Sequence, residues 1–381
     1  MPPTPPPELP EADLPLRGVT VLDLSRVLAG PLATMVLADL GADVLKVERP
    51  GTGDDTRGWG PPFAGDDAAY FLALNRNKRS ITLDLATEAG RAEARRLALR
   101  ADVVVENFRP GLMASFGLAH EQLTPEHPGL VSCSIPAFEE GEDPTRPGYD
   151  IIVQALSGHM SVTGEPDGPP TRPGVALLDI VCGLYAANAI QAALLRRAAT
   201  GKGAHVTVSL FASGVAALVN QAANHLVGGE VPHRMGTAHP NIVPYQVFGA
   251  ADRPFVLAAG NDRAFARTCD VLGRPDLATD ERFATNAGRV ANRRALLPVL
   301  EAAFATRPAA AWLAELAAAG VPCAEVRSID EVFASPEGAA TLQLVVDPAH
   351  GDHRLPRNPI RIDGATLPVR LPPPPLGDGS R

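Results

Sequence analysis

Near its N-terminus the chain reads Gly18-Val19-Thr20-Val21-Leu22-Asp23-Leu24-Ser25-Arg26-Val27-Leu28-Ala29-Gly30-Pro31. Residues 19–24 form a short run of β-branched residues and leucine, which is typical of a buried β-strand. Gly30-Pro31 interrupts the run. Residues 32–40 then have the apolar spacing of a helix that ends before Gly41. The stretch therefore predicts a strand–turn–helix unit, the repeating piece of an α/β fold.

The same alternation continues along the chain. Further strands are predicted at residues 42–47, 80–85, 102–106, 130–134 and 205–209, and helices at residues 87–99, 183–200 and 210–225. Strands that alternate with helices of this length favour right-handed βαβ units and a parallel sheet. We therefore predict an α/β protein with a Rossmann-like large domain over residues 16–227.

The pattern changes near residue 228. Residues 234–245 are polar and loop-like. A predicted strand at 255–259 follows, and then come predicted helices at 262–272, 292–306 and 309–319. This change predicts a smaller α/β or α+β domain over residues 228–330.

Both ends of the chain are rich in proline. Residues 1–15 read MPPTPPPELPEADLP, and residues 367–381 contain four consecutive prolines. Such compositions do not form packed elements of their own. We predict disordered tails at residues 1–15 and 367–381.

Composition excludes several classes of protein. The chain has 381 residues, long enough for two or three domains, and its 34 basic and 43 acidic residues give a net charge of −9. The basic residues are scattered, which argues against a nucleic-acid surface. We find no apolar run of the ~18 residues that a membrane span needs and no signal-peptide pattern. The four cysteines lack metal-ligand spacing. We expect a cytoplasmic protein with reduced thiols and no metal, membrane or nucleic-acid partner.

Asp179 is an acid set between two apolar runs. A loop rich in proline and glycine leads into residues 175–178, and residues 180–187 are again apolar. Burying a carboxylate without a partner costs free energy, and function is one reason for keeping it. The other reading is that Asp179 is the N-cap of the following helix. The segment alone leaves both readings open.

Six further motifs follow residues 18–31 in order: LADLGADVLKVERP at 37–50, GDDTRGW at 53–59, LNRNKRSITLD at 74–84, ADVVVENFRPG at 101–111, PGYD at 147–150 and QALSG at 154–158. Together they resemble the family III CoA-transferases of the CaiB–BaiF family, of the formyl-CoA transferase and carnitine CoA-transferase type. The resemblance covers residues 16–365. It implies that residues 228–330 are an inserted domain, that residues 331–366 return to the large domain, and that two ring-like subunits interlock as a homodimer.

The resemblance implies that Asp179 is the nucleophile, because Gly174-x-Ala176-Leu177-x-Asp179 matches the segment that ends in the family's catalytic acid. Asp179 would attack an acyl-CoA to give a mixed anhydride. CoA thiolate would then give an aspartyl-CoA thioester, which a free carboxylic acid resolves. The site must be dry. No metal or general base is needed, since we expect the carboxylate to be ionised at pH 7. CoA enters as a substrate and not as a permanently bound cofactor.

Further site residues follow from the same resemblance. Asp150 matches an acid near the nucleophile, although the N-cap of its own helix is an equal reading. Arg49 matches an arginine near the adenosine phosphates. Arg109 lies in a loop after a buried strand, where ligand contacts are common. For both arginines the alternative is a solvated surface charge. The complete set of expected CoA contacts is Val27, Leu28, Ala29, Arg49, Leu83, Asn107, Phe108 and Arg109.

The chain departs from formyl-CoA transferase at several positions. Leu28 stands where that enzyme has glutamine, which puts in doubt that this position treats an oxalate-like acid as formyl-CoA transferase does. Pro147 and Ser115 replace a lysine and an arginine, so the phosphate contacts must be redistributed, with Arg76, Lys78 and Arg109 as candidates. The two exchanged acids and the roles of His159 and His239 stay open.

Two other functions compete with CoA transfer. A 2-methylacyl-CoA racemase of the same superfamily uses a histidine in a Gly-His-Asp run, and here that run is Gly148-Tyr149-Asp150. A protein that only binds CoA or NAD is the third class. No G-x-G-x-x-G follows the first strand, which counts against NAD. The sequence favours a CoA-transferase.

Overall fold

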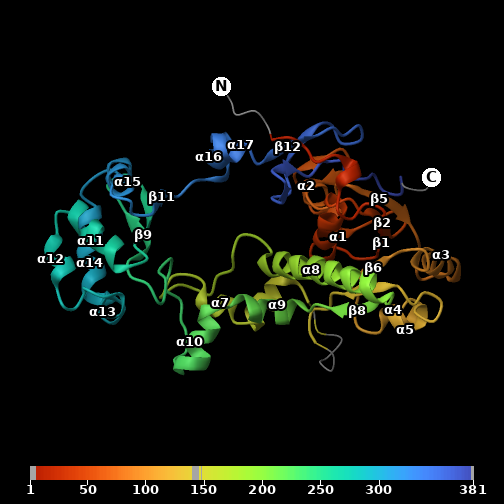
Figure 1. Cartoon of the computed structure of the whole chain (residues 1–381), viewed down its shortest axis with the longest axis horizontal. Coiled ribbons are helices and arrows are strands. Elements are labelled where there is room, and N and C mark those ends of the chain that lie inside the picture. The colour runs from red at the N-terminus through yellow and green to blue at the C-terminus, as the bar shows by residue number, and fades with distance from the viewer. Residues whose placement is uncertain (1–5, 140–145, 147, 379–381) are drawn as a thin grey trace. The chain divides into compact units, whose positions relative to one another are not determined.

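The chain divides into two compact units. The computed structural model describes residues 6–139, 146 and 148–378. The first unit comprises Met1–Gly158, Pro173–Val219 and Pro336–Arg381, and the second comprises His159–Arg172 and Asn220–Ser335 (Figure 1). The second unit thus begins at residue 220 and not at 228, ends at 335 and not at 330, and includes a separate segment at 159–172.

A six-stranded parallel sheet forms the centre of the first unit, in the order β5-β2-β1-β6-β7-β8. All six strands expected from the sequence are confirmed, to within a few residues. They are β1 (Thr20–Asp23), β2 (Asp43–Glu48), β5 (Lys78–Thr82), β6 (Val103–Glu106), β7 (Val131–Ser134) and β8 (Ala204–Thr207). The strand order reverses between β1 and β6, and in open α/β sheets ligands bind at the carboxyl end of such a switch point.

Alternate side chains of each strand enter two separate cores. Val21 and Val103 pack with α1 (Ala29–Asp39) and α8 (Leu177–Thr200) on one face. Leu22 and Val104 pack on the other face, with α3 (Glu88–Ala98). This is the alternation that a strand's two-residue period requires. Helices therefore cover both faces of the sheet, as a parallel sheet needs.

Helix α8 begins six residues before the predicted start at residue 183 and includes Asp179. Contrary to our sequence expectation, it is long and apolar enough to cross a membrane. The core helix of a soluble protein can meet the same criterion of length and apolar composition. The buried side chains of α8, such as Cys182, Ala186 and Ile190, belong to the core shared with α1. We therefore interpret α8 as a core helix.

One predicted helix is divided in two. Residues 210–225 were expected to be continuous, but α9 (Leu210–Ala217) and α10 (Asn220–Gly228) are separate helices. Val219 lies between them with φ 43°, in the left-handed region that β-branched residues rarely adopt. The break coincides with the boundary between the two units.

The second unit has its own core around a three-stranded antiparallel sheet, in the order β11-β10-β9. Its strands are β9 (Tyr245–Gly249), β10 (Pro254–Ala258) and β11 (Cys323–Glu325). Besides α10, its helices are α7 (His159–Val162), α11 (Asp262–Val271), α12 (Pro275–Thr279), α13 (Asn286–Ala291), α14 (Arg293–Phe304), α15 (Ala309–Ala318) and α16 (Ile329–Ala334).

The described parts of both chain ends pack on the first unit, so the expectation of disordered tails is wrong there. Leu9 is buried and its N–H donates to the carbonyl of Thr366 (2.8 Å). Leu371 exchanges hydrogen bonds with Asn77. A proline-rich segment can therefore be held on a folded surface by hydrogen bonds without forming a helix or a strand of its own. Residues 1–5 and 379–381 lie outside the described residues.

Short elements complete the first unit. They are η1 (Glu11–Asp13), η2 (Asp55–Gly58), β3 (Phe63–Ala64), β4 (Asp67–Ala68), α2 (Ala69–Leu72), α4 (Leu112–Ser115), α5 (His120–Leu123), α6 (Asp150–Leu156), α17 (Pro336–Ala339), β12 (Leu342–Val345), β13 (His353–Pro356), β14 (Arg361–Ile362) and β15 (Ala365–Thr366).

Candidate active site

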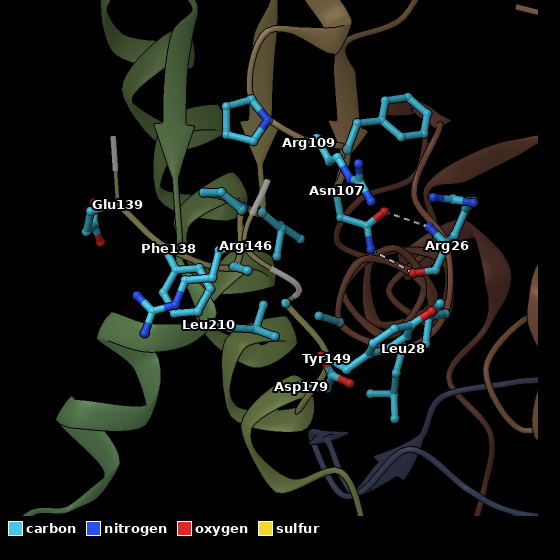
Figure 2. A pocket seen from close by; sticks show the side chains of 18 of the residues that line it. Arg26, Leu28, Asn107, Arg109, Phe138, Glu139, Arg146, Tyr149, Asp179 and Leu210 are labelled. Carbon is cyan, nitrogen blue, oxygen red and sulfur yellow. Dashed lines mark hydrogen bonds between the residues drawn. The ribbon is translucent and has the colours of Figure 1, made fainter. Parts of the chain in front are cut away.

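A cavity of about 290 Å³ lies in the first unit, among the loops that follow β1, β6 and β7. It opens at the carboxyl ends of these strands, next to the switch point between β1 and β6. Figure 2 shows Asp179 among the side chains that line it. The lining residues are Arg26, Val27, Leu28, Ala29, Asp55, Asn107, Phe108, Arg109, Pro110, Ile135, Pro136, Ala137, Phe138, Glu139, Arg146, Gly148, Tyr149, Asp179 and Leu210.

Asp179 occupies the first turn of α8 and is not its N-cap. The helix begins at Leu177, and Ala176 holds the cap position without a side-chain hydrogen bond. The N-cap reading of Asp179 is therefore wrong. Burial, and next the charge of Asp150, raises the pKa of Asp179 from its ordinary 3.8 to about 7. At neutral pH the carboxyl group is thus only partly ionised, which corrects our expectation of full ionisation.

Asp150 supplies the missing cap of α8 from a distant part of the chain. Its Oδ1 accepts hydrogen bonds from the backbone N–H of Leu178 (2.8 Å) and of Asp179 (3.3 Å). Its Oδ2 accepts from Gln154 Nε2 at 2.5 Å. Asp150 does not cap its own helix, because Tyr149 holds that position in α6. It is 7% exposed and lies outside the set of described residues that line the cavity.

Tyr70 lies near the two acids but does not line either cavity. Burial raises the pKa of its phenol, and so do the negative charges of Asp179, Asp150 and Asp54, in that order. The phenol therefore lies in the field of the two acids and stays a hydrogen-bond donor at neutral pH. Its ring packs edge-on against Trp59, with centroids 5.5 Å apart. Gly58-Trp59 was part of a recognised motif, and Tyr70, eleven residues later, carried no signal of its own.

A family model described as "CoA-transferase family III" matches residues 16–380. The chain belongs to CoA-transferase family III. Succinyl-CoA:glutarate CoA-transferase of Mus musculus is 44% identical over 96% of this chain and 85% of its own length. Succinate–glutarate CoA-transferase of Agrobacterium fabrum is 44% identical over 97% of this chain and 95% of its own.

A solved structure agrees with the sequence comparison. The crystal structure of a CAIB/BAIF family protein from Brucella suis has a TM-score of 0.83 and 46% sequence identity, and the match covers 96% of this chain and 97% of that one. The predicted α/β fold with a large parallel sheet is therefore confirmed. The curated relatives establish that this family III protein is a CoA-transferase.

The residues expected to contact CoA lie in two cavities of the transferase. Val27, Leu28, Ala29, Asn107 and Arg109 line the cavity that holds Asp179. A second cavity, of about 270 Å³, contains Arg49 and Leu83. Arg26 and Phe108 line both cavities, so the two adjoin. Arg26 was absent from our expected set although it lies within the first motif, because the resemblance assigned CoA contacts in that motif only to Val27, Leu28 and Ala29.

Two residues considered as substitutes for the lost phosphate contacts are committed elsewhere. Arg76 forms a buried bidentate pair with Asp39, at 3.0 and 2.6 Å. The Nζ of Lys78 is fully buried against Asp23 (3.2 Å). Neither lines either of these two cavities, so the fold does not favour them as phosphate contacts, whereas Arg109 does line the first cavity. Ser115 ends α4 and donates to the carbonyl of Leu112 (2.7 Å). Pro147 lies outside the described residues.

The remaining candidates belong to the second unit. His239 Nδ1 accepts from the backbone N–H of Asn241 (3.0 Å), as in a turn, and its ring contacts Tyr245. His159 is buried in α7. Across the described residues, no group of three or more His, Cys, Asp or Glu is arranged to hold a metal ion.

Proposed function

We propose that this CoA-transferase works through covalent catalysis by Asp179. Three carboxylates line the first cavity, and two of them are engaged. Asp55 is paired with Arg49 and Arg26, and Glu139 accepts a hydrogen bond from Ser209 Oγ (2.6 Å). The carboxyl oxygens of Asp179 have no hydrogen-bond or ion-pair partner among the described residues. A partly desolvated carboxylate without a partner is free to attack, and this observation carries the proposal.

The proposed steps conserve the thioester energy. A carboxylate oxygen of Asp179 attacks the acyl-CoA carbonyl, the C–S bond breaks, and CoA leaves as a thiolate from a mixed anhydride. The thiolate attacks the aspartyl carbonyl, releases the first acid and forms an aspartyl-CoA thioester. The acceptor carboxylate reverses both steps and leaves as the new acyl-CoA. The apolar side chains around the cavity, such as Leu28 and Leu210, limit hydrolysis by water.

Asp150 has a supporting role in this proposal. Asp150 holds the amides of the first turn of α8, so it fixes the position of Asp179 without touching the cavity. The contacts thus support a positioning role for Asp150, where the sequence suggested a second catalytic acid.

Intact-mass analysis tests the covalent route. Incubation with acyl-CoA and no acceptor should add to the chain the mass of CoA less water, as an aspartyl thioester. The adduct should map to the peptide that contains Asp179 and should disappear when an acceptor acid is added. An adduct on another residue would overturn the proposed nucleophile, whereas transfer without any adduct would favour a direct exchange.

The names of the relatives support a substrate class. Both act, by name, on succinate or succinyl-CoA and glutarate, and each is 44% identical to this chain over nearly its whole length. We propose succinyl-CoA as the donor and a dicarboxylic acid of four or five carbons as the acceptor. A screen of C2 to C6 mono- and dicarboxylates should rank glutarate above acetate. Equal transfer rates to glutarate and acetate would contradict the proposed preference for a dicarboxylic acceptor.

CoA phosphates should compete with Asp55 for two arginines. Asp55 accepts from Arg49 at 2.5 Å and lies 3.3 Å from Arg26, and all three side chains are partly exposed at the junction of the cavities. Arg49→Ala should raise KM for acyl-CoA by about 10-fold and leave kcat less affected, because the contact is equal in ground and transition states. Asp55→Asn should lower this KM several-fold, because it frees both cations.

Steady-state kinetics at two salt concentrations measures both variants. Arg79→Ala is the matched control, because Arg79 also forms an exposed ion pair, with Asp43, outside the cavities. A collapsed kcat with unchanged KM in Arg49→Ala would instead place Arg49 at the reacting carbon.

The proposed assembly is an obligate homodimer of interlocked subunits. The chain passes from the first unit into the second and back, as such a ring requires. Large apolar side chains are strongly exposed in the single chain, for example Leu226 (81%), Val227 (90%) and Ile329 (77%), and a partner would bury them. Sedimentation on serial dilution should show no dissociation until secondary structure is lost. A folded monomer on dilution would exclude interlocking and leave the chemistry at Asp179 standing.

A further inference from the structure

Two consecutive peptide groups after β1, from the carbonyl of Ser25 to the N–H of Val27, are held by side chains from other parts of the sequence. The carbonyl of Ser25 accepts from Lys46 Nζ (2.9 Å). Both backbone polar groups of Arg26 bond to Asn107, whose Oδ1 accepts from the N–H (2.9 Å) and whose Nδ2 donates to the carbonyl (2.7 Å), as Figure 2 shows. The N–H of Val27 lies 3.3 Å from both carboxylate oxygens of Asp54.

The held segment has an unusual backbone. Val27 has φ 70°, in the left-handed region that a β-branched residue rarely adopts. The turn also brings Gly30 against Ser25, so closely that a Cβ at position 30 would fall 2.2 Å from the Ser25 side chain. A backbone in this state persists only where its surroundings impose it. The side chains of Lys46, Asn107 and Asp54 provide that constraint.

The constraint is buried and charged. Lys46 Nζ lies 2.9 Å from Asp54 Oδ2, and both side chains are 0% exposed. A buried ion pair is weak support for stability, because desolvation offsets most of its attraction. Its position suggests another use. Val27, Leu28 and Ala29, which the pair and Asn107 place, line the cavity with Asp179.

We propose that Asn107 and the Lys46–Asp54 pair are positioning residues, which force the strained turn at Val27 and so place the wall of the cavity opposite the nucleophile. The assignment deepens the proposed function, since it takes the cavity of Asp179 as the reaction site. It also changes the expected role of Asn107. Each polar atom of its amide makes one hydrogen bond to the backbone of Arg26, so we assign Asn107 to holding the turn rather than to binding CoA directly.

Asn107→Ala is the central test, and Asn358→Ala is its matched control. Like the half-buried Asn107, the buried Asn358 makes two hydrogen bonds: its Nδ2 donates to Asp39 (3.0 Å), and its Oδ1 accepts from the N–H of Ile360 (3.0 Å). It lies outside both cavities. Loss of two hydrogen bonds should lower thermal stability in both variants. Only Asn107→Ala should lower kcat for CoA transfer, by about 10- to 100-fold, because the turn moves.

The outcomes separate the possible roles of Asn107. A higher KM for acyl-CoA with normal kcat would make Asn107 a direct CoA contact and overturn the positioning role. Equal kcat in Asn107→Ala and Asn358→Ala would reduce it to a structural hydrogen bond. Overall transfer is measured, so the result does not depend on which residue is the nucleophile, which the intact-mass experiment decides independently.

A second variant tests the strained turn itself and also serves if Asn107→Ala folds poorly. Glycine adopts φ 70° without strain. With glycine at position 27, the turn needs less constraint from Asn107. The fold loss of kcat caused by Asn107→Ala, or by the milder Asn107→Asp, should therefore be at least threefold smaller in the Val27→Gly background than in the wild type. Fully multiplicative losses would show that Asn107 does not act through Val27.

Discussion

Asp179→Asn should lower the rate of CoA transfer by at least about 10³-fold while the protein remains folded and binds CoA. Asparagine has nearly the same shape but is not a nucleophile. The covalent adduct should also disappear from the mass spectrum. Glu139→Gln is the matched control, because Glu139 lines the same cavity and should change the rate by only a few-fold. Near-normal turnover by Asp179→Asn would exclude the aspartyl mechanism.

The same substitution should stabilise the fold in a pH-dependent way. The pKa of Asp179 is raised to about 7 in the folded protein. Its contribution to stability is therefore fully present below its unfolded pKa of 3.8 and is lost as pH rises through about 7. Asp179→Asn should thus match the wild type near pH 4 and exceed it at pH 8. The gain is at most about 4 kcal/mol, and less because the carboxyl group borders the cavity. Thermal unfolding at the two pH values measures it.

Asp150→Ala and Asp150→Asn should separate the capping role of Asp150 from its charge. Alanine leaves the N–H groups of Leu178 and Asp179 without their acceptor. We expect Asp150→Ala to lose about 1–3 kcal/mol of stability and to lower kcat by about 10- to 100-fold, because the nucleophile is no longer held. Asparagine keeps an acceptor for both amides. In Asp150→Asn the side-chain amide of Gln154 can flip. Its Oε1, which is buried without a partner, then accepts a hydrogen bond from the Nδ2 at position 150.

The pH–rate profile gives the second readout for Asp150. The attacking form of Asp179 is ionised, so kcat should rise with pH through about 7 and level off above it. The negative charge of Asp150 is one cause of the raised pKa of Asp179. Asp150→Asn should therefore move the acidic limb to lower pH and retain most of the plateau rate at pH 8. If the acidic limb of the profile is the same in Asp150→Asn and the wild type, the ionisation that it reports belongs to a group other than Asp179.

Local pattern was enough to predict the sheet and to single out Asp179 as an unusual acid. Strand β1 and its neighbours are short β-branched runs whose burial on both faces appears directly in composition. Thr87 caps α3 from the adjacent residue, within the same window of sequence. Asp179 stands out because its flanks are apolar. Such features involve residues that are close in sequence, so a single chain without relatives reveals them.

Contacts between distant residues decided the rest. Asp150 caps α8 from 28 residues away, and so the start of the helix was misread from sequence. Arg76 and Lys78 resemble available cations until the fold buries them against Asp39 and Asp23. The turn at Val27 depends on Asn107, 81 residues beyond Arg26. Hydrogen bonds and desolvation act through space, so the fold alone determines which polar groups are partnered. Of the three carboxyl groups among the described residues that line the cavity, only that of Asp179 has no hydrogen-bond or ion-pair partner.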